Sequence, residues 1–592
     1  MAFRYIAGHR LMQPLYDRRL SRGRMKHAIT VLAVLAVLPQ GGFTDAVWSL
    51  CGAAAAVFLC LRWKKRLPLP VAISMAAMVL VYIVSALNHG LSYESLAAIG
   101  RLLVMCLLVI SFYNMDIDIY ETVFVSGMIV AAIGFVAFCE ILQWDGAVAS
   151  RRLQSVFQYS NTAGLYLGVS AFLTRQDKRW KPYSIFIETA MVLTQSVGAL
   201  LVYIAGWAIY LAKNRQVRLA PAFFSFVVSL LLAGMIYAIV YVIRVPQLAI
   251  LLPAALIIFR NKIQRIVQLL SDHKGIAWAG LGACAAAIIA VFAMRGLTPL
   301  ATYLERLIQI SDGINVMARH PLGIGPGAWQ FFYQSYQSAP YNAAFMHCGY
   351  VAAGVDAGFL AIIPMAFFLA YWLRHQKWGD KCVGMIMILL HAVMDISFSF
   401  LSIALFAAML LADTLPKPKQ KPLPMPIRGT LALPIALCAV IFASSAIKNS
   451  AAWSANAGDI TEASALLEKL PVHSDMEASL TQMRLYLTAG EHERLDDAFA
   501  IMPQPNAEAY SIKAQSLLER KEYMEAAECA FICAGMSPYN QDSIALVNEA
   551  ILHLDAAEQP GYREMLYTLE AEHRVNALFT YITKIGENNG KG

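Results

Sequence analysis

Long apolar segments alternate with short basic ones along this chain, and the alternation limits its fold more than any other feature. A helix needs about 20 mostly apolar residues to cross the hydrocarbon core of a bilayer, and several segments reach that length. Hydrophobic residues make up 58% and charged residues 15% of the 592 residues, whereas soluble domains have about 25% charged residues. The sequence therefore predicts an all-α, polytopic transmembrane helix bundle with about 13 to 15 spans. The apolar segments are 27–42, 45–62, 69–88, 95–113, 120–143, 162–174, 183–195, 198–212, 219–243, 247–260, 274–294, 347–373, 382–394, 396–413 and 429–447.

Lysine and arginine gather in alternate loops between these segments. Such loops favour the cytoplasmic side of a membrane, so the net charge of +8 indicates membrane orientation and not nucleic-acid binding. The arginine-rich segment 1–26 is then a cytoplasmic tail, and 114–121 is the one expected inner loop without Lys or Arg. We expect a multi-pass protein of the cytoplasmic membrane whose carboxy-terminal part lies outside. The basic inner loops are 62–66, 175–181, 213–218, 260–265, 374–381 and 417–428.

Three parts follow from this pattern: the tail 1–26, a membrane domain over 27–447, and a soluble domain over 448–592. The longest outer loop of the membrane domain is 295–346. Loops longer than about 15 residues are commonly functional, which makes 295–346 the first place to look for a site.

The carboxy-terminal part contains a recurring segment. Similar Gly/Lys-acidic starts occur at Gly458, Gly490 and Lys521, and prolines follow near Pro471, Pro505 and Pro538. The clearest unit, 509–540, resembles a tetratricopeptide repeat, which predicts an α-solenoid of stacked helix pairs. Such a domain docks a protein or glycan partner, or it serves as a structural cap; the sequence leaves both open.

Ionisable residues mark possible chemistry near the outer membrane face. Arg306 and His347 flank the long loop, while Arg152 and Arg244 lie beside shorter ones. A guanidinium binds diphosphate oxygens in a bidentate fork, and a histidine can accept a proton from a hydroxyl. Each taken singly has a simpler interpretation, since an arginine at a helix end commonly snorkels to headgroups.

Nucleotide and metal motifs are not evident in the sequence. The glycine-rich stretch Gly323–Gly327 lacks the Lys-Ser/Thr that follows in a phosphate-binding loop. We find no zinc-ligand spacing and no nucleophile elbow, so no metal and no cofactor is expected.

Several motifs together resemble the O-antigen ligase and polymerase family of bacterial membrane proteins. They are Arg306, the turn His320–Gly327, His347 at the start of a helix, and Asp356 before Ala357 and Gly358. A second stretch, from Arg152 through Asn161 to Tyr166, is also similar to the family pattern. Two positions depart from it: Val197 stands where the ligases have an arginine, and Cys348 stands where Asn or Ser is usual.

The resemblance implies an inverting, metal-independent glycosyltransferase acting on the outer face. A glycan on undecaprenyl diphosphate is the implied donor, and a hydroxyl on a lipid, protein or sugar is the acceptor. It implies Arg306 and His347 as catalytic residues. Arg152, Arg244, Asp356, Gly325 and Gly327 are implied to bind diphosphate or substrate, with Arg152 or Arg244 standing in for the arginine missing at Val197.

Two other classes of protein remain open from the sequence. A non-catalytic assembly protein would use the outer repeats to recruit partners. A transporter would show inverted repeats and broken helices, for which the stretch 195–198 gives slight support. Ligase and polymerase share the same motifs and are not distinguished. The partners expected are the lipid-linked glycan, its acceptor, membrane lipids and a protein on the repeats; nucleic acid is not expected.

Overall fold

Helices dominate the structure, which is a computed structural model describing residues 27–214, 219–271, 298–417 and 429–572. The described residues hold one two-stranded sheet, β1 (Val148–Ala149) paired antiparallel with β2 (Arg152–Leu153). The predicted all-α class is therefore confirmed. The expected tail 1–26, the apolar segment 274–294 and most of the inner loops 213–218 and 417–428 lie outside the described residues.

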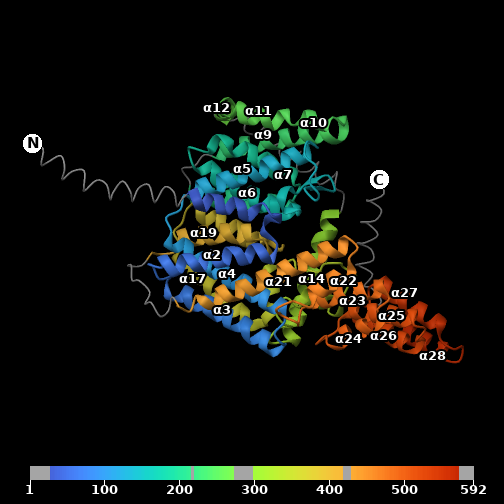
Figure 1. Cartoon of the computed structure of the whole chain (residues 1–592). Helices are drawn as coiled ribbons and strands as arrows, with labels where there is room; N and C mark the ends of the chain where they lie inside the picture. Colours follow the sequence, from blue (N-terminus) through green and yellow to red (C-terminus); the bar gives the residue numbers. More distant parts are fainter. Residues whose placement is uncertain (1–26, 215–218, 272–297, 418–428, 573–592) are drawn as a thin grey trace, which may run out of the picture. The chain divides into compact units, whose positions relative to one another are not determined.

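The chain divides into two compact units, which Figure 1 shows in the colours of the sequence. The first contains Met1–Leu69, Val104–Met294 and Tyr371–Leu431, and the second contains Pro70–Leu103, Arg295–Ala370 and Ala432–Gly592. Three helices have residues in both units: α3 (Leu69–Asn88), α4 (Tyr93–Asn114) and α17 (Phe359–His375). Each unit is described by itself below.

The first unit is a bundle of apolar helices joined by short turns. Its elements begin with the helix His27–Val37 and continue with η1 (Gln40–Gly42), α2 (Asp45–Arg62), α5 (Ile119–Phe138), β1, β2, η2 (Ser155–Phe157), α6 (Ser160–Gln176), η3 (Lys181–Tyr183), α7 (Ser184–Leu193), α8 (Val197–Lys213), α9 (Leu219–Ala238), η4 (Ile239–Ile243), α10 (Pro246–Ala249), α11 (Leu251–Ile258), α12 (Arg260–Ser271), α18 (Asp380–His391), η6 (Ser397–Ser399) and α19 (Leu401–Thr414).

The second unit contains the long loop of the sequence and the carboxy-terminal helices. Much of the predicted outer loop 295–346 is helical, because α14 covers 22 of its residues. The elements are α14 (Thr298–Arg319), α15 (Trp329–Phe332), η5 (Tyr333–Ser335), α16 (Gly349–Ala357), α21 (Ala432–Asn456), α22 (Ile460–Leu467), α23 (Met476–Ala489), α24 (His492–Ala500), α25 (Ala507–Glu519), α26 (Tyr523–Met536), α27 (Gln541–His553) and α28 (Gln559–Glu572).

Six helices among the described residues are long and apolar enough to cross a membrane. They are Asp45–Arg62, Leu69–Asn88, Tyr93–Asn114, Ile119–Phe138, Ala220–Ile243 and Ala432–Asn456. Five shorter apolar helices accompany them: His27–Val37, Val197–Lys213, Pro246–Ile258, Phe359–His375 and Leu401–Thr414. Several of the predicted spans thus correspond to helices shorter than a full crossing, such as α7 and α18. By length and composition, these apolar helices support the expectation of a membrane protein.

A buried ion pair joins four helices of the first unit. Arg175 on α6 lies 3.3 Å from Glu188 on α7, and the Glu188 side chain has no exposed surface. Glu188 also accepts hydrogen bonds from the hydroxyls of Tyr203, Ser225 and Ser229 on α8 and α9. Buried charges require such pairing because their desolvation is costly, so this network fixes how the four helices pack.

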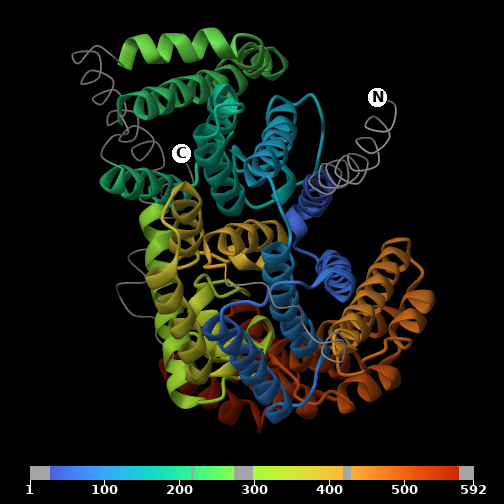
Figure 2. The ribbon, with the colours of Figure 1, turned by 90° about the vertical axis from the view of Figure 1, so that its left-hand side faces the viewer.

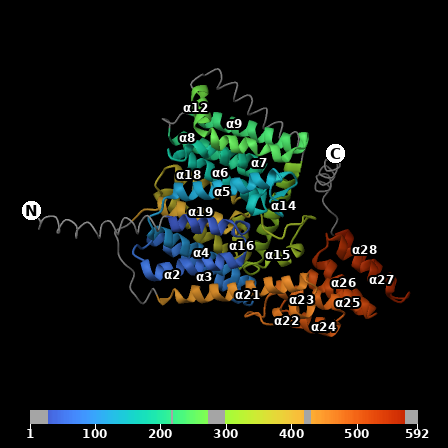
Figure 3. The same ribbon diagram turned by 45° about the horizontal axis from the view of Figure 1, so that its top comes forward.

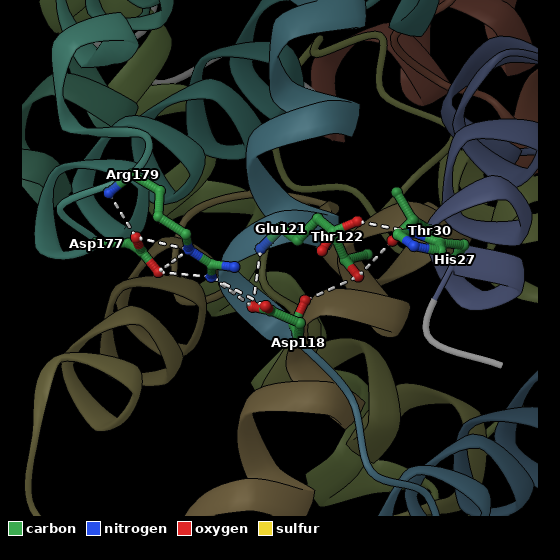
Figure 4. Close-up of polar contacts among 7 residues, drawn as sticks. All are labelled: His27, Thr30, Asp118, Glu121, Thr122, Asp177 and Arg179. Carbon is green, nitrogen blue, oxygen red and sulfur yellow. Dashed lines mark hydrogen bonds and ion pairs between the residues drawn. The ribbon is translucent and has the colours of Figure 1, made fainter. Parts of the chain in front are cut away.

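The basic loops of the first unit contact one another at the same helix ends. Figure 4 shows Arg179, which follows α6, donating to Asp118 at the start of α5 at 2.9 Å. His27 lies 3.0 Å from Glu121 in the same group. The arginine-free loop 114–121 thus obtains a cation from its basic neighbour. Further contacts extend the group: the Lys64 backbone N–H to Asn114, Tyr120 to Asp380, and Lys213 over the Trp378 ring.

The intervening loops of the first unit form a second group at the other helix ends. Gln40 donates to Gln158 at 3.1 Å, and the Tyr159 hydroxyl donates to Asp395 at 3.2 Å. Arg151 lies 5.7 Å from the ring centre of Tyr241. Within the first unit, loops that the sequence predicts on the same side of the membrane thus contact one another, and the side that faces the cytoplasm stays a prediction.

The carboxy-terminal helices follow one another in a row of neighbouring antiparallel pairs (Figures 1 and 2). The second helix of successive pairs begins after a left-handed residue, at Gly458, Gly490 and Lys521, with φ of 87°, 72° and 65°. These are the three starts found in the sequence, so the recurrence is also one of backbone geometry. Small residues such as Ala527 and Ala530 are fully buried where these helices pack.

Helix α21 continues from the apolar part into the first of these pairs (Figure 3). The predicted boundary at residue 448 therefore falls inside a continuous helix. Near it, Lys448 lies 3.2 Å from Asp475. The backbone N–H of Met476, at the start of α23, donates to Glu94 of α4 at 2.8 Å. The carboxy-terminal helices are thus attached to α4 and α21 within the second unit.

Candidate functional site

Helix α14 carries a buried polar face in the second unit. Arg306, Gln309 and Asp312 follow each other at three-residue intervals, so their side chains lie on one side of the helix. Their exposed fractions are 9%, 1% and 2%. Polar side chains are buried at this level only where the surrounding chain offers them partners, and the partners of Gln309 and Asp312 come from the segment that precedes α16.

Gln309 holds the backbone that leads into His347. Its Oε1 accepts the His347 backbone N–H at 2.9 Å, and its Nε2 donates to the Phe345 carbonyl at 2.9 Å. A longer bond of 3.3 Å reaches the Ala343 carbonyl. His347 therefore lies beside α14, one helical turn from Arg306, with a half-buried side chain. The structure thus ties the His347 backbone to the helix that carries Arg306, and the catalytic roles of both residues stay predictions.

A close helix crossing fixes the distance between α14 and α16. A Cβ on Gly313 of α14 would meet Val351 of α16 at 2.5 Å and Met346 at 2.8 Å. Gly354 of α16 likewise faces Met317 of α14 with no room for a side chain. Because α16 begins two residues after His347, this crossing determines how near the histidine lies to the polar face of α14.

Asp356 holds the glycine-rich turn against α3. Its Oδ1 accepts the Gly327 N–H at 3.1 Å, and its Oδ2 accepts the Tyr82 hydroxyl at 3.2 Å. Gly325 and Gly327 have φ of 101° and 76°, in the region that favours glycine. A Cβ on Gly327 would meet the backbone of Glu94 at 3.0 Å. These contacts show Asp356, Gly325 and Gly327 shaping the turn; their binding of substrate stays a prediction.

Arg152 belongs to the first unit, where it spans the break between α7 and α8. Its Nε donates to the Thr194 carbonyl at 3.0 Å, and one terminal nitrogen donates to Asn161 at 3.0 Å. Asn161 in turn donates to Asp395, which is 1% exposed, at 2.9 Å. The guanidinium thus lies at the break that directly precedes Val197, the position of the arginine missing from the family pattern.

Arg244 also lies in the first unit, at the end of the π-helical turn η4. It adopts a left-handed conformation with φ of 63°, and its side chain is exposed. Among the described residues its side chain has no hydrogen bond or ion pair, and its backbone N–H donates to the Ile239 carbonyl. Of the two candidates to replace the missing arginine, Arg152 alone contacts the α7–α8 break.

The sequence interpretation missed Gln309 and Asp312. The Asp312 Oδ2 accepts the Ser338 N–H at 3.0 Å and the Tyr341 hydroxyl at 2.9 Å. Burial together with the neighbouring Asp312 carboxylate raises the pKa of Tyr341 above its ordinary value, so the phenol remains a hydrogen-bond donor at neutral pH. No sequence pattern marks either residue, because their hydrogen-bond partners lie 26 to 38 positions away along the chain.

In the described part of the chain, no three His, Cys, Asp or Glu side chains lie close enough together to bind a metal ion. The chemistry that the α14 face offers is that of a guanidinium, an imidazole, an amide and a carboxylate. Such a set can bind an anion and move a proton.

The fold and this site define a helical membrane protein with a polar site on α14 and α16. Comparison with known protein families and with curated proteins found no match for the chain. The functional argument therefore depends on the residues described above.

Proposed function

We propose that the protein transfers a glycan from undecaprenyl diphosphate to an acceptor hydroxyl on the outer face of the cytoplasmic membrane, in the manner of an O-antigen ligase or polymerase. The observation that carries this proposal is the Gln309 amide, which joins the His347 backbone to the helix that presents Arg306. Arg306 and His347 are 41 positions apart in the sequence, and Gln309, three residues after Arg306, binds the His347 backbone. The motif resemblance supplies the reaction.

In the proposed reaction Arg306 binds the diphosphate of the donor and stabilises the charge that develops on it as the bond to the sugar breaks. Preorganised cations at a developing charge are a large source of rate enhancement. His347 accepts the proton of the acceptor hydroxyl, whose oxygen forms the new bond to the anomeric carbon. The leaving group is polyprenyl diphosphate, and the glycosidic configuration inverts.

The topology that this reaction needs is supported by the loop contacts of the first unit. Arg179 and the other basic loops occupy one group of helix ends and the loop 144–159 the other. By the positive-inside rule the basic group faces the cytoplasm. We propose about 13 to 15 spans, with the amino terminus inside and the tetratricopeptide-like helices of 448–592 outside.

The test replaces the two catalytic candidates in the full-length protein. We expect Arg306→Ala to lower transfer by about 10²–10³-fold, as loss of one charge-stabilising group does. We expect His347→Ala to lower it by about 10²–10⁴-fold. Transfer is measured in membranes supplied with undecaprenyl diphosphate-linked oligosaccharide, by separating lipid-linked from transferred glycan.

Matched control residues are available within the second unit. Arg319 lies on α14, 13 residues after Arg306, and is exposed; His473 is exposed in the second unit. Arg319→Ala and His473→Ala should retain transfer. If Arg306→Ala and His347→Ala also retain it at normal protein levels, the enzymatic proposal is wrong and a scaffold role replaces it. In a deletion strain, accumulated single repeat units would indicate a polymerase, and accumulated full-length lipid-linked chains a ligase.

A further inference from the structure

The segment between α14 and α16 is held from two sides within the second unit. We name residues Trp329–His347 the outer strap. On one side α14 holds the strap through Gln309, which bonds to Ala343, Phe345 and His347, as described above. Asp312 adds bonds to Ser338 and Tyr341. This side fixes the second half of the strap, which ends at the histidine.

The carboxy-terminal helices hold the first half of the strap. The Nδ2 of Asn506 donates to the Phe331 carbonyl at 3.1 Å, and the Ser335 hydroxyl donates to the Met536 carbonyl at 3.1 Å. The Tyr539 hydroxyl donates to the Ser338 carbonyl at 3.2 Å. The Phe331 ring also packs against the apolar cluster of α23, α24 and α25. Several repeat helices therefore grip the strap, by polar and apolar contacts.

Ser338 is where the two sides meet. Its N–H donates to Asp312 on α14, while its carbonyl accepts from Tyr539 in the repeats. A shift of the repeats moves this peptide directly, and the nine residues from Ser338 to His347 transmit the shift to the histidine. Asn506 itself is 4% exposed, so its bond to Phe331 is made without competition from water.

We propose that the carboxy-terminal helices are a positioning element for His347, with Asn506 and Tyr539 acting through the outer strap. The inference rests on the proposed function, because it is the position of a proton acceptor that the strap sets. It assigns the repeats a role within the transfer reaction in addition to any partner they bind. Geometry errors near 1 Å at a reacting group reduce rates by about 10²-fold, so a loosened strap lowers turnover.

The sharpest variant is Asn506→Asp. Asn506 caps α25 through Oδ1, which accepts the Ala509 N–H at 3.0 Å. An aspartate keeps that cap, but it loses the donor to Phe331 and sets a carboxylate against the Phe331 carbonyl. The matched control is Asn540→Asp, since Asn540 caps α27 by accepting the Asp542 N–H at 3.0 Å and has no bond to the strap. A milder pair is Tyr539→Phe with Tyr562→Phe as its control, because Tyr562 donates to Met524 inside the repeats.

Two measurements on the full-length protein in lipid nanodiscs test the proposal. Hydrogen–deuterium exchange of peptides covering 335–348 reports the strap whatever the reaction is. Steady-state transfer from undecaprenyl diphosphate-linked oligosaccharide reports the site. We expect Asn506→Asp to speed exchange in the strap and to lower kcat about tenfold, with KM for the lipid donor unchanged. Asn540→Asp should change neither, and Tyr539→Phe should act in the same direction as Asn506→Asp to a smaller extent.

Each alternative result contradicts one defined part of the proposal. Unchanged exchange in Asn506→Asp would show that the repeats do not hold the strap. Faster exchange with normal kcat would show that they hold it without positioning His347. If His347→Ala transfers glycan normally, the proposed function fails, and the exchange result still decides whether the strap is clamped.

Discussion

Replacing Glu188 with leucine should destabilise the first unit more than replacing its partner Arg175 with methionine. Loss of Glu188 leaves Arg175 with the Pro221 carbonyl, 3.2 Å away, and the Trp207 ring as its remaining neighbours. An orphaned buried charge costs about 3–5 kcal/mol. The Tyr203, Ser225 and Ser229 hydroxyls also lose their acceptor, which adds about 1–3 kcal/mol. The expected loss is about 4–8 kcal/mol.

Replacing Arg175 leaves the Glu188 carboxylate buried, but with more of its hydrogen-bond partners. In Arg175→Met, Glu188 keeps the three hydroxyl donors, so we expect a loss about 2 kcal/mol smaller than in Glu188→Leu. The double variant removes both charges. Its loss should fall short of the summed single losses by about 2–3 kcal/mol, the coupling typical of residues in direct contact.

Unfolding of the purified proteins in lipid–detergent micelles titrated with SDS gives these free energies. Arg374→Met is the control, because Arg374 is exposed on α17 and surface changes stay within about 0.5 kcal/mol. If the single losses sum to the double within about 0.5 kcal/mol, the ion pair does not exist. If Arg175→Met is the more damaging single variant, the assignment of the hydroxyls to Glu188 is wrong.

Two further predictions concern the backbone and the topology. Gly358 has φ of 77° and a Cβ there would collide with the Pro321 carbonyl, whereas Gly490 has φ of 72° with open space around it. Gly358→Ala should therefore cost about 2–6 kcal/mol, from strain and overpacking, and Gly490→Ala about 1–2 kcal/mol; equal shifts in thermal unfolding midpoint would contradict the close approach. In a variant without the ten native cysteines, a membrane-impermeant maleimide should label Asp145→Cys but not Lys178→Cys on intact cells. A fusion reporter at the carboxy terminus should be active outside. The opposite labelling would reverse the proposed orientation.

The sequence predicted the helical class because hydrophobic length is a local property. The segment 69–88 is α3, and the starts at Gly458, Gly490 and Lys521 recur in the backbone. The number of membrane spans was harder to predict, because the apolar segments 183–195 and 382–394 correspond to helices of only 10 and 12 residues. A short apolar run has no pattern that distinguishes a full crossing from a buried helix.

The candidate site was predictable only in its charged members. Arg306 and His347 were visible because an ionisable residue stands out in an apolar chain. Gln309 was not, because its role comes from hydrogen bonds to residues 34 to 38 positions away. Such contacts leave no periodic trace in the sequence. Asp312 and Asn506 were missed for the same reason.

The contact between Asp118 and Arg179 has a consequence for biosynthesis. The two residues are 61 positions apart, so Arg179 has not yet been synthesised when Asp118 is added to the growing chain. His27, by contrast, is synthesised 94 residues before its neighbour Glu121. The Arg179–Asp118 contact therefore forms only after the chain has been made through α6 and the turn that follows it, so it stabilises α5 in the completed protein and not while α5 is being synthesised.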